Sequence, residues 1–241
     1  MIVVIPARLQ SKRVPGKALV DIAGKSLLQR CWESAQVAAK FAKRCKVYIA
    51  TPDKEIIDHV QKFGAEVVET SNSPVNGTER VAEAANLLKL APDTIVINCQ
   101  GDMFNFPPTL FAGLKRTILQ GAKLVTAVAS HCDNYSLEDY HVVKAYVGRY
   151  DLIHHFSRMK YRPPGIGPAK AFAHVGIYGA KKHKFDYYTD FGQVSDEVTW
   201  GLEQLRWKEP FVAIAIRNYP LKVDEMSDIL YTKSQCEVLG L

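Results

Sequence analysis

A cluster of positive charges follows the first apolar segment of the chain. Residues 2–5 read Ile-Val-Val-Ile, which has the length and β-branched content of a buried parallel strand. In an open α/β sheet, ligands bind at the carboxyl ends of the strands. Fixed cations there, with a glycine such as Gly16 that lets backbone N–H groups approach an anion, can hold a polyphosphate. The cations are Arg8, Lys12, Arg13 and Lys17.

The same loop has an ordinary alternative interpretation as a solvated basic turn, because Pro6 and Pro15 exclude regular structure. Its position directly after the first strand favours phosphate binding. The spacing is neither that of a G-x-x-x-x-G-K-[ST] phosphate loop nor that of a G-x-G-x-x-G dinucleotide turn.

An acidic residue occupies the corresponding place after a later strand. Residues 94–99 form an apolar run that ends in Gln100-Gly101-Asp102. Magnesium is commonly bound by one or two carboxylates together with phosphate oxygens, so Asp102 could reach a metal-bound polyphosphate. The alternative is that Asp102 is only a turn residue without a role in metal binding.

The elements that must position these side chains alternate between strand and helix. We predict strands at 46–50, 65–69 and 94–99 and helices at 26–41, 53–63 and 79–90. This β-α-β-α-β order predicts a Rossmann-like, mostly parallel sheet with right-handed crossovers.

The second half of the chain is less regular. A helix at 107–121 and a strand at 123–129 continue the pattern, but aromatic residues, histidines and Pro163-Pro164-Gly165 interrupt it afterwards. We predict an inserted mixed β lobe, then a helix at 197–209 and a strand at 211–216. The domain prediction is a nucleotide-binding α/β half at 1–129, an inserted sugar-binding or dimerisation lobe at 130–191, and a C-terminal part at 192–241 that completes the core.

Composition restricts the class of protein. The net charge is +6, which favours anionic partners, but no zinc-finger, RNP or long basic-helix pattern predicts nucleic-acid binding. The five cysteines are widely spaced, without a metal-binding pair or a disulfide framework, as is typical of a reducing cytosol. With no signal peptide and no apolar stretch of transmembrane length, we expect a cytoplasmic protein without membrane insertion.

Several motifs carry a family resemblance that covers most of the chain. Pro6 begins P-A-R-x-x-S-x-R-x-P-G-K, Gly77-Thr78-Glu79-Arg80 resembles S-G-T-[DE]-R, and Gln100-Gly101-Asp102 resembles the start of Q-G-D-[EA]-P. Later segments resemble H-[LI]-G-[IV]-Y from His174, L-E-Q-L-R from Leu202, and the V-D of V-D-T-P-E-D at Val223. The chain resembles the family of 3-deoxy-manno-octulosonate cytidylyltransferases, or CMP-Kdo synthetases, which are sugar-activating enzymes of the nucleotide-diphospho-sugar transferase fold.

The resemblance implies a Mg²⁺-dependent reaction in which CTP and an acidic 2-keto sugar give a CMP-sugar and pyrophosphate. It implies that Lys17, Arg8, Arg13 and Asp102 are catalytic, that Asp102 and Asp224 bind the metal, and that the enzyme is a homodimer. The implied nucleotide-binding residues are Ala7, Arg8, Ser11, Arg13, Lys17, Gly77, Thr78, Arg80 and Gln100. The implied sugar-binding residues are Gln100, Lys144, Arg158, His174, Tyr178, Glu203 and Gln204.

Structural explanations remain open for some of these residues. Thr78 could be only a helix cap. His174 and Tyr178 could be packed strand residues. Glu203 and Gln204 could lie on a solvated helix face.

The chain departs from the family pattern at a few positions. Asn76 replaces a serine, which is a mild change, whereas Met103, Phe104 and Trp200 stand where an acid, a proline and another acid are usual. These three changes favour, as an alternative to the octulosonate, a different acidic sugar as the acceptor. A nucleotide-binding paralogue without catalysis is a separate alternative, and Lys17, Asp102 and Asp224 argue against it. Lys12 lies outside the matched pattern and is predicted to be solvated.

Overall fold

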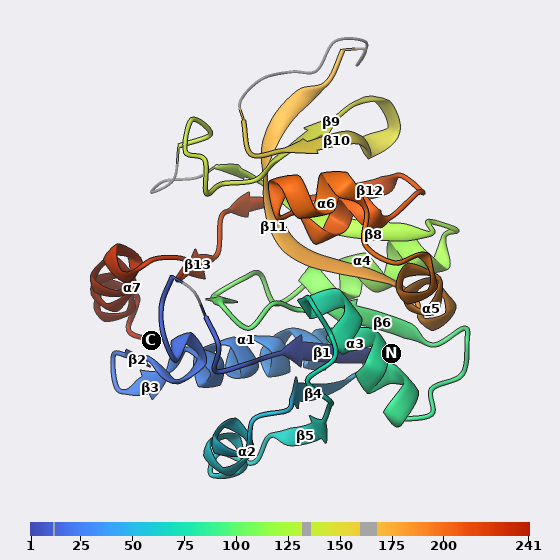
Figure 1. Cartoon of the computed structure of the whole chain (residues 1–241). Coiled ribbons are helices and arrows are strands. Elements are labelled where there is room, and N and C mark those ends of the chain that lie inside the picture. The colour runs from blue at the N-terminus through green and yellow to red at the C-terminus, as the bar shows by residue number, and fades with distance from the viewer. Residues whose placement is uncertain (12, 132–135, 160–167) are drawn as a thin grey trace.

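The computed structural model describes residues 1–11, 13–131, 136–159 and 168–241 (Figure 1). Lys12 and the predicted turn Pro163-Pro164-Gly165 lie outside these residues. Among the described residues, none of the helices combines the length and apolar composition needed to cross a membrane.

The centre of the molecule is a mixed sheet, which has nine strands within the described part of the chain. β1 pairs in parallel with β4 and β6, and β4 pairs in parallel with β5, as the β-α-β-α-β pattern predicts. The prediction of an α/β fold is therefore confirmed. The strand order is β5 (Glu66–Glu69), β4 (Lys46–Thr51), β1 (Ile2–Pro6), β6 (Ile95–Asn98), β11 (Lys170–Lys181), β8 (Leu124–His131), β12 (Phe211–Asn218), β10 (Leu152–Ser157) and β9 (Lys144–Val147).

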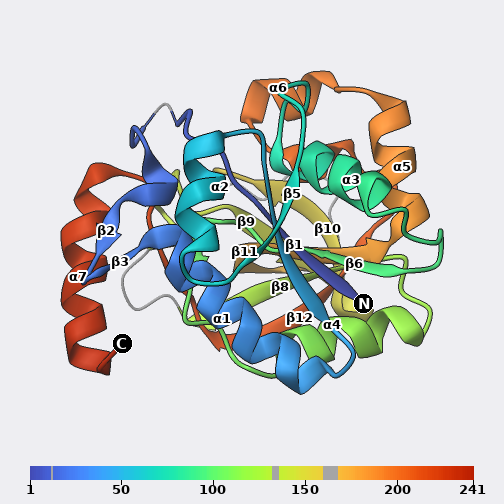
Figure 2. The same cartoon turned by 90° about the horizontal axis from the view of Figure 1, so that it is seen from below.

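Helices cover both faces of this sheet. Val3 and Ile5 of β1 pack into the cluster that includes α1 and α4, whereas Val4 packs into the cluster with α3 and α5. Successive side chains of a strand point to opposite faces, so an uninterrupted apolar run is the expected pattern for a strand covered on both sides. Figure 2 shows α1 and α4 along one side of the sheet and α3 and α5 along the other. The helices are α1 (Leu27–Ala42), α2 (Lys54–Gln61), α3 (Gly77–Leu87), α4 (Leu110–Leu119) and α5 (Lys182–Phe191).

The segment predicted as an inserted lobe, 130–191, contains mixed strands but also contributes to the main sheet. Its longest strand, β11, lies between β6 and β8 and pairs with both in the antiparallel direction. The first residues of β11 pair with β9, so that β11, β8, β12, β10 and β9 pair in a closed ring. The register of β11 against β8 shifts between His174 and Tyr178, where Gly176 has a φ of 77°. This bulge redirects the side chains on either side of it.

The predicted helix at 197–209 is wrong in its extent. The structure has α6 at Ser195–Trp200, then Gly201 at a φ of 60°, and then a 3₁₀ turn at Glu203–Arg206. Gly201 ends the helix in the left-handed conformation that glycine adopts without steric cost. The interruption turns Glu203 and Gln204 away from a fully solvated helix face, since both residues line a cavity.

A third, smaller core lies beside the first loop. It joins the hairpin of β2 (Asp21–Ile22) and β3 (Lys25–Ser26), the two-stranded ladder of β7 (Met103–Phe104) and β13 (Leu221–Lys222), and α7 (Met226–Leu239). The first loop ends in the short 3₁₀ turn Lys17–Leu19, and a similar turn, Arg149–Asp151, precedes β10. In Figure 1, α7 lies beside this hairpin.

Candidate active site

A cavity of about 700 Å³ lies where the loops after β1 and β6 meet the bulge of β11. Its volume is typical of a small-molecule site, and its position is the carboxyl edge of a doubly wound sheet. All but three of the predicted site residues line it. They are Ala7, Arg8, Ser11, Arg13, Lys17, Gly77, Arg80, Gln100, Asp102, Arg158, His174, Glu203, Gln204 and Asp224.

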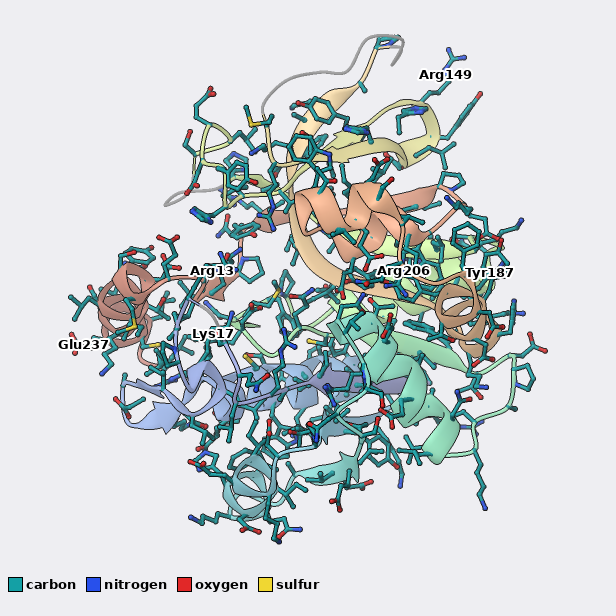
Figure 3. The ribbon with its side chains drawn as sticks, in the orientation of Figure 1. Arg13, Lys17, Arg149, Tyr187, Arg206 and Glu237 are labelled. Atoms are coloured by element: carbon teal, nitrogen blue, oxygen red, sulfur yellow. The ribbon has the colours of Figure 1, made fainter. Side chains whose placement is uncertain are left out.

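The cations of the first loop meet the predicted metal carboxylates. Lys17 Nζ donates to Asp102 Oδ2 at 2.7 Å and to the carbonyl of Val223 at 3.1 Å. Arg13 donates to Asp224 Oδ1 at 3.2 Å. Figure 3 shows Arg13 and Lys17 together on the α7 side of the molecule. The loop that could hold phosphates is thus already anchored to the two carboxylates.

Asp102 and Asp224 are brought together by the ladder of β7 and β13. The N–H of Val223 donates to the carbonyl of Asp102 at 3.0 Å, so the two aspartates belong to adjacent backbone segments. Burial alone would raise the pKa of Asp224, but Lys222, Lys17 and Arg13 outweigh it and hold that pKa below its usual range. Two carboxylates on one cavity wall are hard oxygen donors, which suit Mg²⁺ in the presence of phosphate oxygens.

The start of α3 forms another wall of the cavity. The helix cap is Asn76, whose side-chain oxygen accepts from the N–H of Glu79 at 2.9 Å, and not Thr78 as the sequence suggests. Thr78 is fully buried and lies behind the wall, where its hydroxyl accepts from Asn98 Nδ2 at 3.2 Å. Arg80 lines the cavity and donates to Thr70 Oγ1 at 2.6 Å.

Glu203 joins this helix end to the predicted sugar wall. One of its carboxylate oxygens accepts from the N–H of Thr78 at 3.1 Å. The other accepts from Gln100 Nε2 at 3.1 Å and from the hydroxyl of Tyr178. Burial raises the pKa of Glu203, and the donors around it oppose that rise. Glu203 therefore orients the amide of Gln100, and Tyr178 supports it from behind the cavity wall.

His174 lines the cavity as a neutral side chain. It is 5% exposed, its ring is stacked on that of Tyr178 at 6.1 Å, and its Nε2 lies 2.9 Å from Thr126 Oγ1. Burial, aided by the charge of Lys222, lowers the pKa of His174 to about 3. A histidine in this state can hydrogen-bond a hydroxyl but cannot serve as a general acid near neutral pH.

The two cations predicted to bind the sugar carboxylate have different positions. Arg158 lines the cavity and donates to the carbonyls of Trp200 at 2.7 Å and Gly201 at 3.2 Å. Lys144 does not line the cavity; it is fully buried and donates to the carbonyls of Asp139, Val142 and Arg158. Direct binding of a sugar by Lys144 is therefore not supported, because backbone carbonyls surround its ammonium group. Lys144 instead holds the backbone that carries Arg158.

The three departures from the family pattern are also separated. The side chain of Met103 lines the cavity, whereas Phe104 packs with Val223 and Cys236 in the small core beside α7. Trp200 is 41% exposed, and its contact with Arg158 is made by the backbone carbonyl. Within the described residues, Met103 is the only one of the three whose side chain faces the cavity.

Sequence reasoning missed two further features of the site. Lys222 lines the cavity in an ion pair with Asp224, and a lysine between Leu221 and Val223 in an apolar run was the available signal. Arg206 is fully buried below α6 (Figure 3), where it donates twice to Glu197 and once to Glu79. This network holds the 3₁₀ turn that presents Glu203.

The chain is similar to several known proteins. The chain is 35% identical to a 3-deoxy-manno-octulosonate cytidylyltransferase of Cellvibrio japonicus over 98% of both chains. It is 35% identical to a protein of the same name from Chlamydia trachomatis, over 84% of this chain and 79% of that one. A solved structure of CMP:2-keto-3-deoxy-manno-octonic acid synthetase complexed with CTP superimposes with a TM-score of 0.83, at 27% identity, over 100% and 99% of the two chains.

A more distant neighbour shares the fold alone. HddC from Yersinia pseudotuberculosis superimposes with a TM-score of 0.65 at 18% identity over 97% of this chain and 98% of that one.

The family described as cytidylyltransferase matches residues 2–213, which include both the cationic loop and most of the cavity. On this match and on the curated relatives, the chain belongs to the cytidylyltransferase family.

Proposed function

We propose that the protein transfers the cytidylyl group of CTP to a sugar acid of the 3-deoxy-octulosonic type, giving a CMP-sugar and pyrophosphate. The observation that carries the proposal is the meeting of three groups in one cavity. These are the cations of the first loop, the carboxylates Asp102 and Asp224, and a wall of polar side chains on β11 and the 3₁₀ turn. The names of the curated relatives support the same reaction.

The cationic loop would bind the triphosphate. In the reaction, the anomeric hydroxyl of the sugar attacks the α-phosphorus, a new O–P bond forms, and the bond to the pyrophosphate oxygen breaks. Such a transfer depends on positioning and charge neutralisation more than on covalent catalysis by the protein. Arg8, Arg13 and Lys17 can hold the phosphates and stabilise the charge that develops on pyrophosphate.

Asp102 and Asp224 are the residues that would hold Mg²⁺. The bound ion would neutralise phosphate oxygens and favour ionisation of the attacking hydroxyl. Each carboxylate is paired with an ammonium group in the structure, Asp102 with Lys17 and Asp224 with Lys222. The two carboxylates and their ammonium partners therefore lie together in one cavity.

The acceptor would contact the wall formed by Gln100, His174, Glu203 and Gln204. Neutral His174 can bond a sugar hydroxyl, and the amide of Gln100 is oriented by Glu203. Arg158 supplies positive charge at this end of the cavity. A different acidic sugar is the second candidate, because Met103 places an apolar side chain on the wall. The presence of Lys17, Asp102 and Asp224 in one cavity argues against a paralogue without catalysis.

We also propose a cytoplasmic homodimer. The four described cysteines are all unpaired by disulfide, which is compatible with a reducing compartment. Tyr140, Tyr150 and Met159 are exposed apolar side chains around β9 and β10. Analytical ultracentrifugation would measure the oligomeric state, and a monomer at micromolar concentration would contradict the dimer.

The experiment that tests the function is a pyrophosphate-release assay with Mg²⁺, CTP and a panel of acidic sugars. We expect release to require both CTP and a 2-keto-3-deoxy sugar acid, and to be lost with ATP or GTP. Binding of CTP without release in the presence of any acidic sugar would instead identify a paralogue without catalysis.

A further inference from the structure

Lys222 places a buried positive charge in the cavity. The lysine is 8% exposed and belongs to β13, where it is paired with Met103 of β7. Its ammonium group forms an ion pair with Asp224 and lies 3.4 Å from the hydroxyl of Tyr219. A buried ammonium is costly unless carboxylates or other acceptors surround it, so the fold has a specific place for this charge.

This charge lies between the two halves of the site. On one side, Tyr219 donates to the carbonyl of His174 at 3.3 Å, which ties the segment to the wall assigned to the sugar. On the other side, Val223 donates to the carbonyl of Asp102. Lys222 is therefore adjacent both to the reacting phosphate end and to the acceptor end of the cavity.

The other described cations that line the cavity have different positions. Three belong to the first loop, at the triphosphate end. Arg80 donates to Thr70 and to the carbonyl of Ser71. Arg158 donates to two backbone carbonyls beside α6. Among these described cations, only Lys222 lies on β13, the strand that pairs with Met103 of β7.

We propose that Lys222 binds the carboxylate of the sugar acceptor and makes the enzyme select an acid over a neutral sugar. An ammonium group carries three donors on a flexible stem, so Lys222 can contact Asp224 and a substrate carboxylate together. In a 2-keto sugar acid, the carboxylate is bonded to the carbon that bears the anomeric hydroxyl. The same contact would therefore direct that hydroxyl toward the α-phosphorus. This inference rests on the proposed function.

A purely structural role is the competing explanation, in which Lys222 acts only by holding Asp224. The two explanations differ in what the substitution changes. Loss of a carboxylate ligand reduces kcat/KM for the acid but not for an uncharged analogue. Loss of support for Asp224 reduces both equally and changes the dependence on Mg²⁺.

The test compares Lys222→Met with the wild type on the sugar acid and on its carboxamide, at saturating CTP. We expect kcat/KM for the acid to fall at least ~10-fold, as for the loss of a charge-assisted hydrogen bond, while the value for the carboxamide changes less than about twofold. The KM for CTP and the Mg²⁺ dependence should stay near wild-type values. Lys182→Met, which removes another ion-paired lysine outside the cavity, is the matched control.

Equal losses on the acid and the carboxamide, or a shifted Mg²⁺ dependence, would overturn the inference. Lys222→Gln keeps a hydrogen-bond donor of similar length without the charge, and it provides the same comparison if the methionine variant does not fold. Circular dichroism and calorimetric CTP binding establish folding in each case. If the wild type releases no pyrophosphate with any acidic sugar, the proposed function itself has failed; if it does and the variants lose equally on both acceptors, only this inference has failed.

Discussion

Lys17 Nζ lies 2.7 Å from the carboxylate of Asp102, although the two residues come from the loops after different strands. Both side chains are mostly buried, at 17% exposure each, so their attraction is screened less than that of a surface pair. The contact joins the cationic loop to the edge of β6. A triphosphate entering the cavity must therefore take over part of the ammonium charge from Asp102.

The position of Lys17 predicts a large kinetic effect. Lys17→Met should lower kcat/KM for CTP by about 10²-fold or more, because it removes charge stabilisation of the leaving pyrophosphate. Lys25→Met, which removes a half-exposed lysine paired with Glu33, should change it less than about twofold. Lys12→Met should also have the smaller effect. Steady-state pyrophosphate release measures all three, and equal losses would reduce the loop to a generic basic patch.

The two aspartates predict dependence on a divalent metal. Asp102→Asn and Asp224→Asn should each lower turnover at least ~10²-fold, since each removes a charge from the proposed Mg²⁺ site. Affinity for CTP should fall less, because the cations of the first loop remain. Titration of activity with Mg²⁺, and its loss in EDTA, checks this. Asp93→Asn, at an exposed ion pair with Lys181, is the control. Near-normal turnover of Asp224→Asn at saturating Mg²⁺ would show that Asp224 does not bind the metal.

Met103 predicts a change in acceptor preference. An unpaired sugar hydroxyl costs about 1–3 kcal/mol against an apolar wall, which corresponds to roughly one or two orders of magnitude in discrimination. We expect the wild type to prefer an acceptor with fewer hydroxyls or an apolar substituent, and Met103→Glu to shift preference toward the octulosonate. The ratio of kcat/KM values for such acceptors measures this. Trp200→Glu, on the surface, should leave the ratio unchanged. If the wild-type enzyme instead strongly prefers the octulosonate, Met103 does not contact the sugar.

His174 predicts a dependence of stability on pH. Its pKa is lowered to about 3 in the folded state, against about 6.5 in the unfolded chain, so the unfolded state binds more protons between these values. Stability should therefore be lost as the pH falls below about 6.5, by roughly 2 kcal/mol between pH 7.5 and pH 5. His174→Gln should remove this part of the slope in urea titrations. His183→Gln, on the surface of α5, should retain it, and identical slopes for the wild type and His174→Gln would contradict the prediction.

Arg206 predicts a large effect on folding. It is fully buried and donates to Glu197 and Glu79, so Arg206→Met would leave carboxylates without their charge partner. Removing one partner of a buried ion pair costs about 3–5 kcal/mol, to be measured as the free energy of unfolding in urea. Lys54→Met, at an exposed pair with Asp58, should leave the free energy of unfolding close to that of the wild type, because water and salt screen a surface pair. Arg206 also packs on the ring of Tyr188, with its Cζ 4.1 Å from the ring centroid. Adding Glu197→Gln to Arg206→Met should recover part of the loss, and no recovery would place the cost in this packing instead.

The strands and helices of the first half could be predicted because apolar spacing and turn residues agree there. The cationic loop and Asp102 follow from their positions after buried strands. The helix predicted at 197–209 was wrong because Gly201 ends it, and a single glycine within an apolar pattern does not reveal its φ angle.

The surroundings of two lysine side chains could not be predicted from the sequence. Lys144 and Lys222 both interrupt β-type segments, yet one is surrounded by backbone carbonyls and the other faces the cavity. That difference depends on which segments the fold packs around each ammonium group. Local sequence does not carry this information, whereas the motif around Gly176 did indicate where His174 would lie.

The place of β11 in the sheet has a consequence for synthesis of the protein on the ribosome. β6, whose residues are all buried, ends at Asn98, but the strand that pairs with its second edge is not complete until Lys181. At roughly 5–20 residues per second, this edge stays open for several seconds while the nascent chain lengthens. An open apolar edge can recruit other chains, so molecular chaperones that shield nascent strands should raise the soluble yield of this protein. Nascent chains stalled on the ribosome before residue 170, which lack β11, should therefore bind such chaperones more strongly than nascent chains in which β11 is complete.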